Sequence, residues 1–258
     1  LAVFDNLKDF HVKQVYKGGK LVAENGKMLH QKEKNTDWST EIKERVFHSF
    51  HRVPITVEEL QLKETTGTHQ RVIDMVAHEL ITKERIEEWK ELPGVAPGVD
   101  ISRDIVKLAA IERHKNTGHV GLGFLGKYGL KKGAVATSIG HDSHNLVIAG
   151  VTDEDMVLAG NRVIENGGGL AIALEGKVLA DLPLPIGGLM ADEPVEVVDE
   201  KLEHMKKIST ELGISEDIDA FMTLAFISLP VIPKLRLNTY GIVDVEKHQV
   251  VKARFETE

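Results

Sequence analysis

Two apolar stretches, Gly133-Ala-Val-Ala-Thr-Ser-Ile-Gly140 and Leu146-Val-Ile-Ala-Gly150, enclose the polar cluster His141-Asp142-Ser143-His144-Asn145. Short runs of small and β-branched residues bounded by glycine predict two buried strands. The five polar residues between them would then lie at a strand end or in a tight turn, where the core holds the backbone and side chains face a cleft. Active-site residues are commonly mounted in this way, so the cluster is a candidate site.

Turn chemistry is the competing interpretation of this cluster. Asp142 would then hydrogen-bond to its own backbone, and both histidines would be half exposed. A second group of residues favours function, because the apolar run at residues 105–111 ends at Glu112-Arg-His114 and His119 follows soon after. Four of the twelve histidines lie between residues 114 and 144, so imidazole chemistry is concentrated in one part of the chain.

The composition is that of a globular protein. With 258 residues, 42% hydrophobic and 28% charged, the chain suffices for one large domain, or one medium domain with appendages. A formal net charge of −8 argues against a nucleic-acid or anionic-membrane partner, and no apolar run approaches the roughly 20 residues that span a bilayer. The absence of cysteine excludes disulfides and thiolate metal sites and fits a cytoplasmic location. Any metal would need His, Asp or Glu ligands, which suit manganese, iron or zinc.

The first 40 residues predict a small unit and a linker. Leu1-Ala-Val-Phe-Asp5 carries neither an initiating methionine nor a signal-peptide pattern, and it indicates a chain that begins inside a domain. Residues 12–16 and 20–24 alternate around a glycine turn and predict a β-hairpin. The predicted organisation is residues 1–30, a polar linker at 31–40 and a main domain at 41–258.

The main domain is predicted to be rich in strands with helices packed on them. Residues 41–51 predict a short helix or an extended arm, residues 57–62 a strand or sheet edge, and residues 82–89 a helix or an edge strand. Strands are expected at 71–77, 105–111, 118–126, 133–139, 145–151, 170–174 and 177–182, helices at 152–164, 193–212 and 217–229, and extended segments at 235–237 and 241–245. This succession predicts an α+β or mixed α/β fold with a layered β-sheet.

Three consecutive glycines, Gly167-Gly168-Gly169, follow the first of these long helices. They invite a phosphate-loop interpretation, but the stretch lacks the lysine and Ser/Thr of that motif and lies at a helix C-terminus, the wrong end for anions. Glycine is the usual terminator of a helix, so we predict a helix end here.

An ordered set of motifs carries a resemblance to a known family. The set resembles the C-terminal domain of bacterial and archaeal adenine deaminases, members of the amidohydrolase superfamily, over most of residues 65–250. The opening hairpin is similar to the end of the small β-sandwich that flanks the barrel in amidohydrolases. The motifs are, in chain order, Glu112-Arg-His114, Gly118-His-Val-Gly-Leu-Gly123, Gly140-His-Asp-Ser-His-Asn145, Asp153-Glu-Asp-Met156, Gly167-Gly-Gly169, Leu182-Pro-Leu-Pro185, Gly188-Leu-Met190, Asp192-Glu-Pro194 and Pro230-Val-Ile-Pro233.

The resemblance implies hydrolytic deamination of adenine to hypoxanthine and ammonia at a binuclear manganese or iron centre. In the family the main metal ligands lie on an N-terminal (β/α)8 barrel and include a His-x-His strand. No His-x-His occurs in this chain, so no metal ligand is assigned to it. The implied partners are adenine, the barrel of the same protein and further copies in a homo-oligomer, and the chain alone is expected to be inactive.

The resemblance also suggests roles for the two polar groups, which would face a substrate pocket at the mouth of the barrel. Asn145 has a donor and an acceptor suited to a base edge, and Asp142 is suited to fixing an imidazole tautomer. The candidate catalytic residues are His141, Asp142, His144 and Glu112, and the candidate substrate-binding residues are Asn145, Ser143, His114, Arg113 and His119.

Two other interpretations of the chain stay open. The polar residues would form a structural network at a domain interface in a non-catalytic lid or oligomerisation module, with helices 194–212 and 217–229 as its surfaces. Alternatively, histidines 114, 119, 141 and 144 would form an independent metal site.

Overall fold

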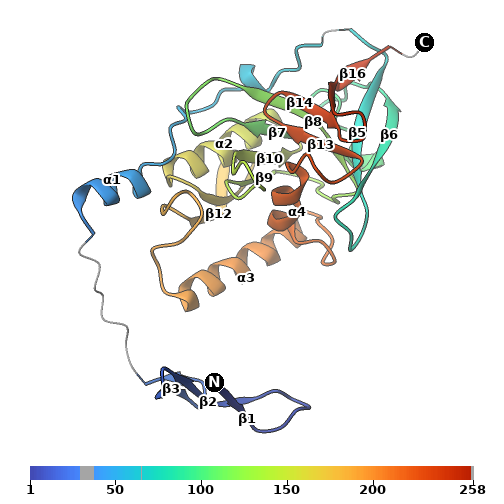
Figure 1. Cartoon of the computed structure of the whole chain (residues 1–258). Coiled ribbons are helices and arrows are strands. Elements are labelled where there is room, and N and C mark those ends of the chain that lie inside the picture. Colours follow the sequence, from blue (N-terminus) through green and yellow to red (C-terminus); the bar gives the residue numbers. More distant parts are fainter. Residues whose placement is uncertain (30–37, 65, 257–258) are drawn as a thin grey trace. The chain divides into compact units, whose positions relative to one another are not determined.

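The computed structural model describes residues 1–29, 38–64 and 66–256, and within them the chain divides into two compact units, Leu1–Ile42 and Lys43–Glu258 (Figure 1). Most of the predicted linker, residues 31–37, lies outside the described residues. Trp38 and Ser39 have no regular structure, and Thr40 begins helix α1 (Thr40–Phe47). The domain boundaries proposed above stay a prediction.

The first unit is an antiparallel sheet in the order β1-β2-β3-β4. The predicted hairpin is present as β2 (Val12–Lys17) and β3 (Lys20–Glu24), joined through Gly18 and Gly19. Both glycines have positive φ, 56° and 75°, which a tight hairpin turn requires. The sequence did not reveal the two short flanking strands, β1 (Ala2–Phe4) and β4 (Lys27–Met28).

A nine-stranded sheet forms the centre of the second unit. Its order is β12-β11-β9-β10-β7-β8-β5-β16, with β6 also paired to β5, and its described pairs are antiparallel except for the parallel pair β5 and β8. The predicted mixed α/β fold is thereby confirmed. The strands are β5 (His69–Met75), β6 (Thr82–Glu88), β7 (Ile105–Ile111), β8 (Val120–Gly126), β9 (Ala134–Thr137), β10 (Leu146–Gly150), β11 (Gly169–Leu174), β12 (Lys177–Pro183) and β16 (Arg254–Phe255).

Both faces of this sheet are covered, which explains why its central strands read as continuous apolar runs. Along β7, Leu108 and Ala110 join one core cluster, whereas Ala109 and Ile111 join the other. Helix α2 (Asp153–Glu165) covers the second face. The first face carries α3 (Val195–Glu211), α4 (Ala220–Ile227), β13 (Leu235–Asn238), β14 (Gly241–Asp244) and β15 (Gln249–Val251).

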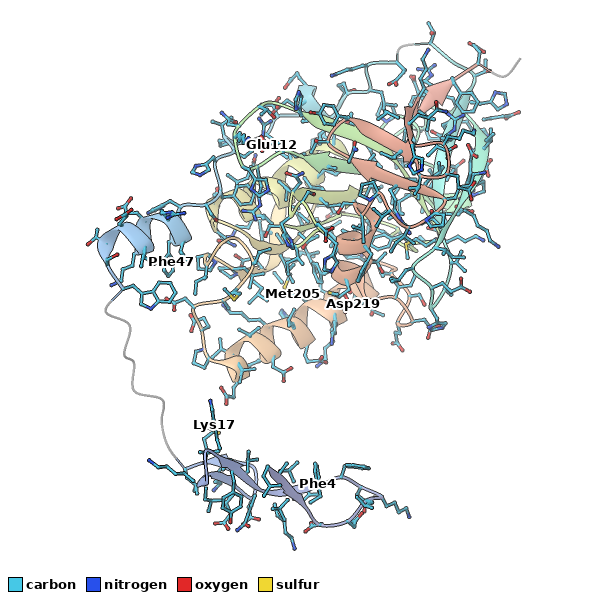
Figure 2. All side chains as sticks on the ribbon, viewed as in Figure 1. Phe4, Lys17, Phe47, Glu112, Met205 and Asp219 are labelled. Carbon is cyan, nitrogen blue, oxygen red and sulfur yellow. The ribbon has the colours of Figure 1, made fainter. Side chains whose placement is uncertain are left out.

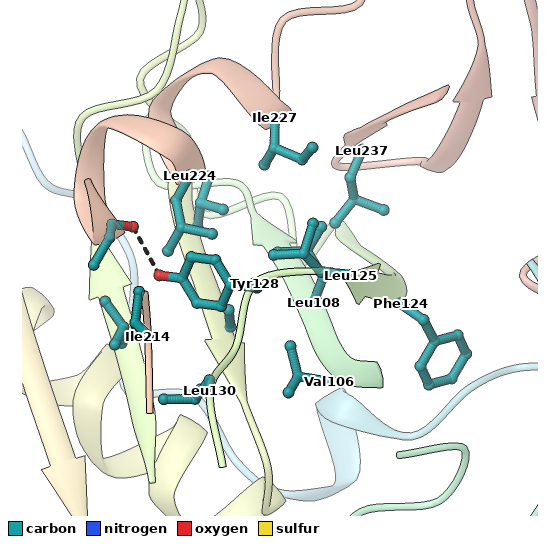
Figure 3. Close-up of a cluster of buried hydrophobic side chains, with 14 of the residues drawn as sticks. Val106, Leu108, Phe124, Leu125, Tyr128, Leu130, Ile214, Leu224, Ile227 and Leu237 are labelled. Atoms are coloured by element: carbon teal, nitrogen blue, oxygen red, sulfur yellow. Dashed lines mark hydrogen bonds between the residues drawn. The ribbon is translucent and has the colours of Figure 1, made fainter. Parts of the chain in front are cut away.

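Figure 3 shows the core on the first face, where side chains of β7 and β8 meet those of α4 and β13. Tyr128, fully buried just beyond β8, donates its hydroxyl to the carbonyl oxygen of Ala220 at 2.7 Å. That bond satisfies a buried hydroxyl and fixes the start of α4 on the sheet.

The helices predicted at residues 152–164, 193–212 and 217–229 are present as α2, α3 and α4, with each end within three residues of the predicted one. Thr152 caps α2 by accepting a hydrogen bond from the Asp155 amide, and the triple glycine ends the helix with φ of 68°, 125° and 139°. The strand predicted at residues 57–62 was wrong: Glu58–Leu60 form a 3-10 turn, η1, which buries Leu60. The segment 82–89, left open between helix and strand, forms β6 over residues 82–88. No described helix is long and apolar enough to cross a membrane.

Candidate functional site

The register between β7 and β10 brings the two polar groups of the sequence to one edge of the sheet. Leu146 pairs with Ile111 in an antiparallel ladder, so β10 begins where β7 ends. The loop after β7 starts at Glu112, labelled in Figure 2, and the loop before β10 ends at Asn145. Two segments about 30 residues apart in the chain therefore form one loop cluster.

Arg113 holds this cluster together from inside. It is 2% exposed, its Nε donates to the carbonyl oxygen of His144, and its Nη2 donates to the carbonyl oxygen of Gly187 at 3.1 Å. The guanidinium also lies over the Phe50 ring at 4.9 Å. Burial lowers the pKa of Arg113, and its Nη1 has no hydrogen-bond partner among the described residues. One buried cation thus joins three segments of the chain.

The histidines of the cluster have different environments. His114 donates from Nε2 to the carbonyl oxygen of Ser143 at 2.6 Å, which ties the two loops directly. The His141 ring packs on Phe226 at 4.6 Å between centroids, and its amide donates to the carbonyl oxygen of Ala225 at 2.8 Å. His141 is therefore positioned by α4, and the sequence around His141 does not predict this contact.

His144 is arranged as a neutral imidazole. Its Nδ1 accepts a hydrogen bond from the Gly140 amide at 3.3 Å, so the proton of the neutral ring lies on Nε2. Burial lowers the pKa of His144, and the positive charge of Arg113 acts in the same direction. The His141 and His144 rings are 6.2 Å apart, a distance that a single water or ligand group can bridge.

The other residues of the central motif, His141–Asn145, differ in exposure. Asp142 and Ser143 are exposed, whereas Asn145 is half-buried. The Oδ1 atom of Asn145 is fully buried and accepts no hydrogen bond within the described part of the chain. Because such acceptors are rarely left unpaired, Asn145 has unused capacity for a water or ligand donor.

Glu112 points back into its own loop. Its carboxylate accepts hydrogen bonds from the amides of His114 at 2.6 Å, Lys115 at 2.9 Å and Thr117 at 2.9 Å, and from the Thr117 hydroxyl at 3.0 Å. Burial opposes ionisation, but these four donors outweigh it and hold the pKa of Glu112 at about 2. The carboxylate stays ionised at any ordinary pH and shapes the loop that carries His114.

Replacing Glu112 by glutamine should therefore cost about 2 kcal/mol of unfolding free energy at pH 7, since charge-assisted bonds are lost. The folded pKa lies below the ordinary 4.5, so the carboxylate stabilises the fold above about pH 4.5, and this contribution disappears as the pH falls from 4.5 towards 2. Urea unfolding of the wild type and the variant at several pH values measures this, with Glu246→Gln, at an exposed position, as control. A difference between wild type and variant that does not shrink in acid would contradict it.

His119 lies on the same loop as Glu112, but its ring packs against Tyr240 at 4.8 Å between centroids. The His119 carbonyl oxygen accepts a hydrogen bond from the Glu112 amide at 3.0 Å. Its side chain is thus directed to the turn between β13 and β14, and it contacts Glu112 through the backbone.

The described residues do not fit a metal centre. Within residues 1–29, 38–64 and 66–256, no three His, Asp or Glu side chains are grouped so that they could hold an ion. Histidines 114, 119, 141 and 144 do not form such a group, so the interpretation as an independent metal site loses its basis. Sequence reasoning missed Phe50, Gly187 and Phe226 as parts of the cluster.

Comparison with known proteins adds the family context. The adenine deaminase C-terminal domain family matches residues 79–249. The chain is 43% identical over 252 residues to adenine deaminase 2 of Carboxydothermus hydrogenoformans, covering 97% of this chain and 43% of that protein. It is 41% identical over 248 residues to the adenine deaminase of Petrotoga mobilis and 43% identical over 250 residues to that of Kosmotoga olearia, covering 42% of each. The chain thus spans about two-fifths of the length of these relatives.

Proposed function

The chain belongs to the adenine deaminase family, whose C-terminal domain it contains, and we propose that it is the part of an adenine deaminase that completes the substrate site. The reaction would convert adenine and water to hypoxanthine and ammonia. The family implies a metal-dependent enzyme, with manganese or iron as the proposed metal. Because the described residues do not fit a metal centre, we assign its ligands to the remainder of the enzyme, the proposed N-terminal barrel.

The observation that carries this proposal is the loop cluster at the edge between β7 and β10. It combines the neutral imidazole of His144, the half-buried imidazole of His141, the exposed carboxylate of Asp142 and the unpaired acceptor of Asn145. The buried Arg113 holds the loops that carry them. A rigid sheet edge that presents such groups is suited to orienting a small polar substrate and moving its protons. A plain surface turn requires neither a buried arginine such as Arg113 nor an unpaired acceptor such as the Asn145 Oδ1 atom.

Each group would have a distinct part in the proposed site. His144, with its proton on Nε2, would donate a hydrogen bond to the purine or a water, and His141 would exchange protons beside it. Asp142 would orient one of these rings when substrate is bound. Asn145 and Ser143 would contact the base edge.

The first loop would play a supporting part. Glu112, whose oxygens are already occupied by the loop, would position His114 near the substrate, whereas the His119 ring faces Tyr240. Arg113 would hold the two loops in register, and its guanidinium would set the positive potential around the bound base.

A non-catalytic role is the second candidate function. Helix α3 has 17 residues, of which only Met205 and Ser209 are buried, and Val195 at its start is 73% exposed. This open face would suit an oligomer contact or the surface of a lid. Gel filtration tests the homo-oligomer, since a chain that elutes as a monomer at all concentrations would contradict it.

Removing the central imidazoles should abolish most of the activity. A hybrid protein is made by joining this chain to the part of the Carboxydothermus hydrogenoformans relative that lies outside the match. Adenine deamination by the hybrid and by the chain alone is then measured in the presence of manganese. His141→Ala and His144→Ala should each lower kcat/KM by about 10²–10⁴, the range of general acid–base contributions. His204→Ala, at an exposed position of α3, should leave activity unchanged.

The outcomes separate the two candidate functions. Full activity in both variants would make the central motif a structural turn and favour the non-catalytic role. An inactive hybrid would contradict the proposed completion of the site. Activity of the chain alone would overturn the assignment of the metal ligands to the remainder of the enzyme.

A further inference from the structure

A cavity lies between the tip of the β5–β6 hairpin and helix α4. Its volume is about 250 Å³, and both elements belong to the second unit. The walls are mainly apolar, with Met75 and Leu80 from the hairpin and Ile218, Met222 and Phe226 from α4 and the segment before it. Arg236, from β13, is the only Arg or Lys among the described residues that line the cavity, and His78 lies at the hairpin tip.

Arg236 is a buried cation without a counter-ion. It is 1% exposed, yet no carboxylate of the described residues lies within ion-pair distance. Lys107, which is equally buried, has Asp153 at 2.6 Å. Burial lowers the pKa of Arg236 to about 10, with no opposing contribution from a carboxylate, so the guanidinium still carries its charge at neutral pH.

The guanidinium of Arg236 has an unused edge. Nε donates to the carbonyl oxygen of Ile232 at 2.9 Å, and Nη2 donates to the carbonyl oxygens of Leu80 and Pro233. Nη1 donates to no acceptor among the described residues. An oxyanion in the cavity would stabilise this buried cation, because it would neutralise the charge and accept hydrogen bonds from the unpaired N–H groups.

We propose that this cavity binds a small monocarboxylate with an apolar body, whose carboxylate is the counter-ion of Arg236. The apolar walls select the body of the ligand. Glu79, Asp217 and Asp219 also line the cavity, and their charges repel a phosphate dianion more strongly than a carboxylate with a single charge. Asp219 does not serve as counter-ion, because its carboxylate caps α4 by accepting from the amides of Phe221 and Met222.

The cavity adjoins the candidate functional site. Phe226 lines the cavity, and its ring packs on the His141 ring. A ligand in the cavity would therefore contact the side chain that supports His141. The proposal stands on the cavity itself and does not depend on the proposed function.

The probe is benzoate, with benzamide as its neutral isostere and inorganic phosphate as the bare anion. Binding to the whole chain is followed by calorimetry and by the methyl resonance of Met222. Benzoate should bind at least tenfold more tightly than either of the other two. Equal binding of benzamide would overturn the role of Arg236, and tighter binding of phosphate would overturn the apolar class of ligand.

Two variants test the position of the carboxylate. Met222→Glu adds a negative charge at the mouth, where the side chain is 45% exposed, and should weaken benzoate binding at least tenfold. Met190→Glu, at an exposed methionine outside the cavity, is the matched control and should leave binding unchanged. Arg236→Met should remove the preference for benzoate over benzamide. Benzoate binding that Met222→Glu leaves intact would overturn the proposal, even if Arg236→Met fails to fold.

Discussion

Replacing Asp153 by alanine should lower the free energy of unfolding by about 3–5 kcal/mol, because it leaves a buried cation unpaired. Asp153 is the first residue of α2, and its Oδ1 lies 2.6 Å from the Nζ of Lys107 in the middle of β7. Its Oδ2 accepts from the side-chain Nε2 of Gln61 at 2.9 Å. Burial already lowers the pKa of Lys107, and Asp153 is the main influence that opposes this.

Urea unfolding followed by circular dichroism measures the loss. The matched control is Glu203→Gln, which breaks the exposed pair between Glu203 and Lys206 and should cost at most about 0.5 kcal/mol. The double variant Lys107→Met with Asp153→Leu should regain much of the stability, since no buried charge is left alone. A single variant as mild as the control would show that Lys107 is neutral in the fold.

The sequence predicted the central sheet because its strands are buried on both faces. Apolar runs such as β7, which is interrupted by Lys107 alone, and β10, which ends at Gly150, contrast with the polar loops between them. The strand at residues 57–62 was predicted wrongly, since three apolar residues in six fit a 3-10 turn as well as a strand edge. Such a short segment carries no period that decides between the two.

The ambiguity at residues 82–89 has a different cause. Strand β6 is stabilised by charges on its neighbour: Arg85 pairs with Asp74 at 2.9 Å, and Glu84 pairs with Arg71 at 2.7 Å. Partners on another strand are invisible in the local sequence, where the same charges suit a solvated helix. The pairing of β5 with β6 decides that this segment is a strand and not a helix.

The candidate site could be predicted only as two local clusters. Polar residues directly after β7 and before β10 were recognisable, since each group follows or precedes an apolar run. Gly187 lies 74 residues from Arg113, and Phe226 comes from α4, so both contacts depend on tertiary packing. The roles of these residues in adenine deamination stay a proposal.

Arg113→Ala should cost about 3–4 kcal/mol of unfolding free energy and loosen the loop that carries the central histidines. Two partly buried carbonyl oxygens, those of His144 and Gly187, lose a charged donor, at about 1–3 kcal/mol each, and the contact with the Phe50 ring disappears. Arg113→Lys should recover little, because a single ammonium cannot reproduce two donors in a fixed fork.

The measurement is urea unfolding together with amide hydrogen exchange across residues 138–146. Exchange in this loop should accelerate at least tenfold in Arg113→Ala, beyond what global unfolding explains. The reason is that the Gly140 amide bonds to the ring of His144, whose backbone carbonyl oxygen accepts from Arg113. The control is Arg45→Ala on an exposed position of α1, expected within about 0.5 kcal/mol of wild type. Unchanged exchange in the loop would mean that Arg113 stabilises the sheet edge without ordering the histidines. This result would contradict the proposal that Arg113 holds the loops of the substrate site in register.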